Sequence, residues 1–177
     1  MPLTVERTSP TTLTITRRFK APPERVFAAH VEPALIQRWC YGYDGWRMPV
    51  CINDARPGGE LRWEWASDEG AGFHVTGTYE VAEPPQDGCP GRIVHVERMH
   101  LPDPTPDNHI ETTFAPDGDG TLLTVVMRVD SPEAMEAMIA TGMTDGMETS
   151  YARIDALERN LNVQLAQIDD YLKRRLR

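Results

Sequence analysis

The sequence predicts an α+β protein in which a curved antiparallel sheet of about seven strands wraps round one long C-terminal helix. Two observations carry this prediction. Between residues 46 and 129, short segments of alternating polarity are separated by turn residues, which is typical of consecutive antiparallel strands. From Met143 to Leu172, apolar residues recur every three or four positions, which is typical of an amphipathic helix. Such a helix can bury its apolar stripe only against the concave face of the sheet.

The first elements are one strand and two short helices. Residues 12–19 alternate apolar and polar side chains and predict the first strand. The next segment, 21–30, begins with prolines, where a helix needs no backbone N–H, and has Glu24 in its first turn. Pro33 ends this helix and begins a second one over residues 33–40.

Six further strands are expected after these helices. The Asp and Gly residues of 117–120 tolerate a tight turn, so the last two strands should be antiparallel neighbours. Three prolines within 101–108 exclude that segment from the interior of a sheet and indicate an exposed loop. The six expected strands span residues 46–54, 61–67, 72–84, 91–100, 109–114 and 121–129.

The C-terminal region predicts a short helix over 131–141 and then the long amphipathic helix. A chain of 177 residues with 40% hydrophobic content fits one compact core. We therefore expect an N-terminal tail at 1–10, a single domain at 11–161 and a helical extension at 162–177. The apolar stripe continues into this extension at Leu165, Ile168 and Leu172, so we also expect that the protein can form a homodimer.

Composition excludes several classes of partner. The chain has 18 basic and 27 acidic residues, a net charge of −9, which lacks the basic surface that nucleic acid requires. Cys40, Cys51 and Cys89 show no spacing typical of a disulfide framework or a metal site, so we expect no metal or cofactor and a reducing cytoplasm. The N-terminus has no signal pattern, and no apolar stretch is long enough to predict membrane insertion.

Five segments carry a resemblance to a known family: 19–39, 53–65, 77–85, 118–127 and 141–157. In this order they resemble the START-like (SRPBCC) superfamily, whose helix-grip fold is shared by polyketide cyclases and the birch-pollen allergen. The sequence is most similar to bacterial proteins that resemble the activator of the Hsp90 ATPase. The resemblance implies the helix-grip fold over nearly the whole chain and does not identify a ligand.

The resemblance also implies which side chains face inward. The family holds aromatic and aliphatic residues inward at positions that match Trp63, Trp65, Tyr79, Ile93 and His95. Alternation along the strand expected at 91–100 then places Glu97 inward as well. A cavity with these walls could enclose a mostly apolar ligand, which a few polar groups would orient. The expected ligand-binding residues are Trp63, Trp65, Tyr79, His95, Glu97, Met127, Met143 and Met147.

Three functions remain open at this point. The first is binding of a small hydrophobic molecule, and the second is acid–base catalysis of a cyclase or hydrolase type with His95 and Glu97. The third is a stress-related or chaperone-associated role, although the eukaryotic activator has a further N-terminal domain for which this chain has no room. His95 and Glu97 could equally form a satisfied structural network. No catalytic motif is recognisable, so we assign no catalytic residue, and we expect His30 to be a core histidine with one hydrogen bond.

Overall fold

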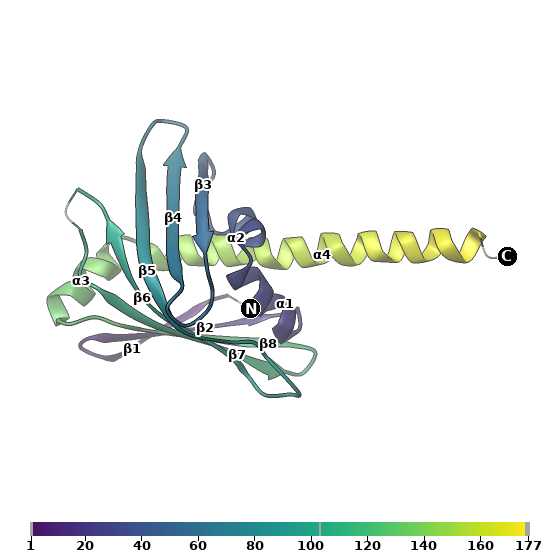
Figure 1. Cartoon of the computed structure of the whole chain (residues 1–177), viewed down its shortest axis with the longest axis horizontal. Coiled ribbons are helices and arrows are strands. Elements are labelled where there is room, and N and C mark those ends of the chain that lie inside the picture. The colour runs from purple at the N-terminus through teal and green to yellow at the C-terminus, as the bar shows by residue number, and fades with distance from the viewer. Residues whose placement is uncertain (1, 103, 176–177) are drawn as a thin grey trace.

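The computed structural model describes residues 2–102 and 104–175, and describes side chains as far as residue 162. Eight antiparallel strands form one sheet with the order β1-β2-β8-β7-β6-β5-β4-β3. Figure 1 shows the sheet strongly curved. The strands are β1 (Thr4–Ser9), β2 (Thr12–Phe19), β3 (Trp46–Asn53), β4 (Glu60–Ser67), β5 (Gly72–Glu83), β6 (Gly91–His100), β7 (Asn108–Asp117) and β8 (Gly120–Arg128).

The strand count is eight instead of about seven, because β1 lies within residues 1–10, for which the sequence predicts a tail. β1 pairs with β2, with Thr4 opposite Thr16. Its side chains are almost all exposed, and even Val5 is 42% exposed. An edge strand held mainly by backbone hydrogen bonds leaves no alternation of apolar residues in the sequence.

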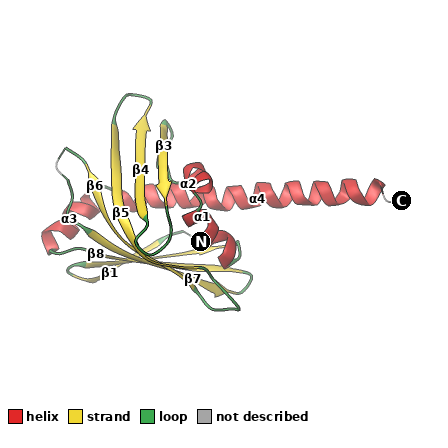
Figure 2. Cartoon of the chain, viewed as in Figure 1, coloured by secondary structure: helices red, strands yellow, loops and turns green. Residues whose placement is uncertain are grey.

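The helices of the described residues are α1 (Pro23–Val31), α2 (Pro33–Trp39), α3 (Pro132–Ala140) and α4 (Met143–Arg175). Figure 2 shows them in red. α1 and α2 carry the chain from β2 to β3, which forms the opposite edge of the sheet. α4 runs across the sheet and projects well beyond it (Figure 1). No helix among the described residues is both long and apolar enough to cross a membrane.

The core lies between the inner face of β2, β7 and β8 and helices α1 and α4. Phe114 of β7 and Leu123 of β8 are fully buried there. Phe19 of β2 meets Tyr151 of α4 edge to face, with ring centroids 5.5 Å apart. The predicted stripe of α4 therefore does bury its first part against the sheet, through residues such as Ile154.

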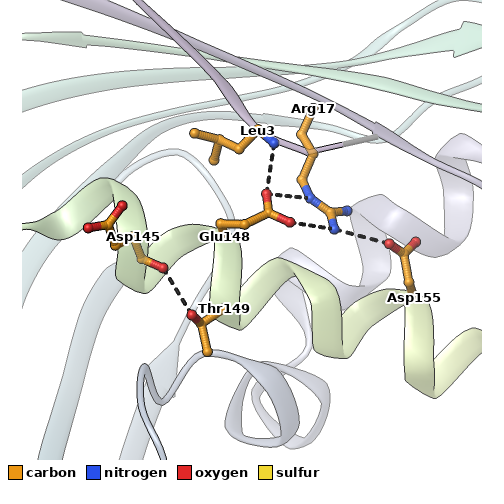
Figure 3. A network of polar contacts seen from close by, with 6 residues as sticks. All are labelled: Leu3, Arg17, Asp145, Glu148, Thr149 and Asp155. Carbon is orange, nitrogen blue, oxygen red and sulfur yellow. Dashed lines mark hydrogen bonds and ion pairs between the residues drawn. The ribbon is translucent and has the colours of Figure 1, made fainter.

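A buried charge network ties α4 to β2 (Figure 3). Arg17 of β2 is only 4% exposed, and its guanidinium donates to Glu148 at 3.3 Å and to Asp155 at 3.1 Å. The backbone N–H of Leu3 donates to Glu148 at 2.8 Å. The guanidinium also lies over the ring of Phe19, 4.5 Å from its centroid. These contacts fix the position of α4 over the concave face.

Candidate functional site

The concave face has two halves, and only one of them carries half-buried tryptophan side chains. In the half formed by β2, β7 and β8, inward side chains such as Ile15, Phe114 and Leu123 are completely buried. In the half formed by β3 to β6, the inward side chains Leu61, Tyr79 and Ile93 are also buried. Trp63 and Trp65 of the same half pack against the core but remain half-buried. We refer to these as the filled half and the open half.

Five of the eight predicted site residues lie on strands of the open half, one lies on β8 of the filled half, and two lie on α4. They are Trp63, Trp65, Tyr79, His95 and Glu97, then Met127, and then Met143 and Met147. Tyr79, His95 and Met127 are buried, whereas the other five are half-buried. The rings of Tyr79 and His95 lie 5.5 Å apart. Met127 belongs to β8 and neighbours Ile110, which in turn pairs with His95. Met143 and Met147 approach from the first turns of α4 and pack against the core.

His95 and Glu97 face inward, as the alternation predicts. The imidazole Nε2 of His95 lies 3.2 Å from Oε2 of Glu97. A carboxylate can only accept a hydrogen bond, so the proton of the neutral imidazole sits on Nε2 and the lone pair on Nδ1. An imidazole oriented by a carboxylate can bind a hydrogen-bond donor or act as a base. Which of these roles the pair has stays a prediction.

Asn53 is a polar residue of this site that the sequence did not reveal. Its Oδ1 accepts hydrogen bonds from the Tyr79 hydroxyl at 2.7 Å and from Trp63 Nε1 at 3.2 Å, and its Nδ2 donates to the Val31 carbonyl at 2.8 Å. Burial raises the pKa of Tyr79, so this hydroxyl stays protonated and remains a donor. Asn53 therefore fixes two aromatic walls of the site to the end of α1.

A bulge in β3 explains why Asn53 was missed. The pairing of β3 with β4 shifts register between Arg47 and Val50, so the side chains change face within the strand. Met48 is buried and Ile52 is 44% exposed, although simple alternation would place them on the same face. No feature of the sequence except Pro49 marks this change.

Asn108 is a second missed residue. It pairs with Glu97 across β6 and β7, and paired residues point to the same side of a sheet. Its Oδ1 is buried and has no hydrogen-bond partner among the described residues. Extending the alternation of Ile110 backwards by two positions would have placed Asn108 on the inner face.

Gly77 occupies the position next to Glu97 on β5. A Cβ atom at Gly77 would lie 2.4 Å from the Val96 carbonyl oxygen, so only glycine allows this close approach of β5 to β6. Glu97 of β6, Gly77 of β5 and Leu61 of β4 are cross-strand neighbours, and the middle one of the three has no side chain.

The thiols near the site are unreactive. Burial raises the pKa of Cys40, with the nearby Cys51 and Glu97 adding to the effect, and burial raises the pKa of Cys51 to about 11. The raised pKa values keep both thiols protonated at neutral pH, and a protonated thiol is a poor nucleophile. Among the described residues, no group of three or more His, Cys, Asp or Glu side chains is placed to hold a metal ion.

Two open hollows lie on the outer face of the sheet. The larger, of about 360 Å³, is bordered by Thr78, Arg98 and His100, and the smaller, of about 310 Å³, shares His100 with it. Of the eight predicted residues, only Glu97 and Trp65 border either hollow. Because both hollows are shallow and mix charges of both signs, they are poor sites for an apolar ligand.

Comparisons with known proteins identify the family. Residues 20–158 match the family described as activator of Hsp90 ATPase homolog 1-like protein. A crystal structure from Rhodobacter sphaeroides is 31% identical, covers 90% of this chain and 99% of its own, and has a TM-score of 0.78. One from Chromobacterium violaceum is 26% identical, covers 82% and 96%, and has a TM-score of 0.68. None of the curated proteins matches this chain.

A solution structure of an AHSA1-like protein from Aeromonas hydrophila is similar in fold, with 22% identity, coverage of 83% and 94%, and a TM-score of 0.65. The family match spans both short helices, the strands from β3 to β8 and the first part of α4. It confirms the resemblance drawn from the sequence segments. The chain belongs to the family of activator of Hsp90 ATPase homolog 1-like proteins, within the START-like superfamily and with its helix-grip fold.

Proposed function

We propose that this protein binds a small, mostly apolar molecule between the open half of the sheet and the first turns of α4. The observation that supports the proposal is the partial exposure of two aromatic side chains on the inner face of the open half. Trp63 and Trp65 turn inward yet stay half-buried, whereas Ile15 and Phe114 in the filled half are fully buried. Half-buried aromatic rings on an inner face are apolar surface available to a ligand.

The wall chemistry supports an apolar ligand with few polar contacts. The sheet contributes two indole rings and α4 contributes Met143 and Met147. Methionine side chains are flexible and polarizable, so they can move to admit molecules of different shape. His95 and Glu97 add the small number of polar groups that typically orient a ligand in such a pocket.

The proposal is tested with N-phenyl-1-naphthylamine, an uncharged apolar probe whose fluorescence rises on leaving water. We expect Trp63→Ala and Met147→Ala to weaken probe binding about tenfold each, because each removes apolar contact area from one wall. Both residues are half-buried, so both variants should keep the circular dichroism spectrum of the wild type.

Matched controls come from the outer face. Thr78→Ala and His100→Ala change residues that border the larger outer hollow, and we expect unchanged probe affinity in both. The proposal fails if the probe binds the wild type and both inner-face variants equally well. It also fails if the two outer-face variants are the ones that lose binding.

A further inference from the structure

Four buried side-chain atoms have no hydrogen-bond partner among the described residues. Two of them, on Arg17 and His30, lie near Tyr151 in the filled half. The other two are Nδ1 of His95 and Oδ1 of Asn108, which belong to the two residues next to Glu97 on the inner face: one precedes it on β6 and the other pairs with it on β7. An unpartnered buried polar atom is unfavourable, so a pair of them at a proposed binding site calls for a partner from outside the chain.

The other polar side chains of the open half already have partners. Tyr79 and Trp63 both donate to Asn53, and Trp65 Nε1 donates to the Cys40 carbonyl at 2.7 Å. These groups position the walls and have no free N–H or O–H to offer. His95 differs from them: it is 7% exposed, and its Nδ1 has no hydrogen-bond partner among the described residues.

The chemistry of the free atom follows from its neighbour. Glu97 accepts the proton of Nε2, so Nδ1 of the neutral imidazole carries a lone pair and accepts hydrogen bonds. Asn108 contributes a carbonyl oxygen, which is also an acceptor. A ligand that satisfies these atoms must therefore supply a hydrogen-bond donor.

We propose that the ligand is a hydroxylated apolar molecule, such as a phenol, whose hydroxyl donates to Nδ1 of His95. This inference rests on the proposed function and adds the class of ligand. Glu97 acts as a positioning residue, because it selects the tautomer of His95 that leaves Nδ1 free to accept.

The test compares 2-naphthol with 2-methoxynaphthalene, which have the same ring system and differ in the donor hydrogen. We expect the wild type to bind 2-naphthol at least about fivefold more tightly, as one additional hydrogen bond in a buried site implies. In His95→Leu the preference should disappear while the ether still binds. In Glu97→Gln it should shrink, because an amide can donate to Nε2 as well as accept from it and no longer fixes the tautomer.

The outcomes separate the two proposals. If the wild type binds both probes equally, or if His95→Leu keeps the preference, the hydroxyl contact is wrong while binding in the open half stands. If 2-naphthoate binds the wild type more tightly than 2-naphthol does, Nδ1 is a donor and the assignment is overturned. If neither naphthol nor ether binds, the proposed function itself fails. The wild-type comparison needs no variant, so the test remains decisive even if His95→Leu does not fold.

Discussion

At the scale of single residues, His30 shows how burial changes the chemistry of a side chain. Its ring lies among Trp39, Phe114 and Tyr151, with centroids 5.0, 5.1 and 5.8 Å away. Its Nδ1 lies 2.7 Å from the Val26 carbonyl oxygen, which confirms the prediction of a core histidine with one hydrogen bond. Burial lowers its pKa from 6.5 to about 4, against a smaller opposing effect of the Val26 contact.

This shift predicts how stability depends on pH. The unfolded chain binds a proton at His30 below pH 6.5, whereas the folded chain does so only near pH 4. The unfolded state therefore holds more protons between these values, and the free energy of unfolding should fall as the pH falls, by about 3 kcal/mol in total. Chemical denaturation at several pH values measures this free energy of unfolding. It should vary less with pH in His30→Phe than in the wild type. His109→Gln, at a half-exposed histidine, is the control, and an identical slope in His30→Phe and wild type would contradict the assignment.

The residue scale also shows what the sequence could reveal about the site. Alternation along a regular strand was enough to place His95 and Glu97 on the inner face, because β6 pairs with β7 without a shift in register. It could not place Asn53, because the bulge in β3 reverses the faces. The hydrogen bond between His95 and Glu97 depends on side-chain geometry that no periodicity encodes.

At the scale of elements, the attachment of α4 to β2 depends on one buried arginine. Glu148 and Asp155 are seven positions apart, which places them on the same face of the helix, and both reach Arg17 (Figure 3). Their side chains are 37% and 22% exposed, against 4% for Arg17. Removing the arginine would leave two neighbouring carboxylates without the positive charge that balances them.

We therefore expect Arg17→Met to lower the free energy of unfolding by about 3 kcal/mol, as breaking a buried ion pair does. Hydrogen exchange should rise first in the part of α4 from 143 to 157. Adding Glu148→Gln and Asp155→Asn to this variant should recover part of the loss, since the unpaired charges are gone. Arg18→Met is the control, because Arg18 pairs with Asp117 at the surface and should cost less than about 1 kcal/mol. An Arg17→Met protein as stable as Arg18→Met would contradict this role.

Prediction of elements succeeded where one face of the element is buried. The alternation of residues 12–19 and the stripe of α4 both reflect contact with the core, and both elements were found close to their observed bounds. β1 was missed for the opposite reason, since its side chains are almost all exposed and mainly its backbone ties it to β2. Local sequence patterns record burial, and they are silent about strands held by main-chain hydrogen bonds alone.

At the scale of the whole molecule, α4 extends far beyond the sheet that it crosses (Figure 1). Leu161 is already 40% exposed. The apolar pattern then continues at Leu165, Ile168 and Leu172, residues that lie outside the part of the chain whose side chains are described. An isolated helical segment of this length is marginal in water without a packing partner. The predicted homodimer would supply one.

Charge favours a second copy as that partner. Four of the chain's 18 basic side chains lie within the last five residues, so the rest of the chain is even more acidic than the net charge of −9. Two extensions that pair in antiparallel fashion would each bring a basic end towards the acidic domain of the other chain. We propose that the extensions pair in this way, with the residues of the stripe forming the seam.

This arrangement predicts that the extension controls the oligomeric state. Light scattering should show a concentration-dependent dimer for the full chain and a monomer for the chain truncated after Asn162, because truncation removes both the stripe and the basic end. Ile168→Asp should weaken the dimer at least about tenfold, since it places a charge in an apolar seam. Gln167→Asp adds the same charge away from the stripe and should have little effect.

Added salt should also weaken the dimer, because it screens the attraction between the basic end and the acidic domain. If the full and truncated chains are both monomeric, or both dimeric to the same extent, the extension has no role in assembly.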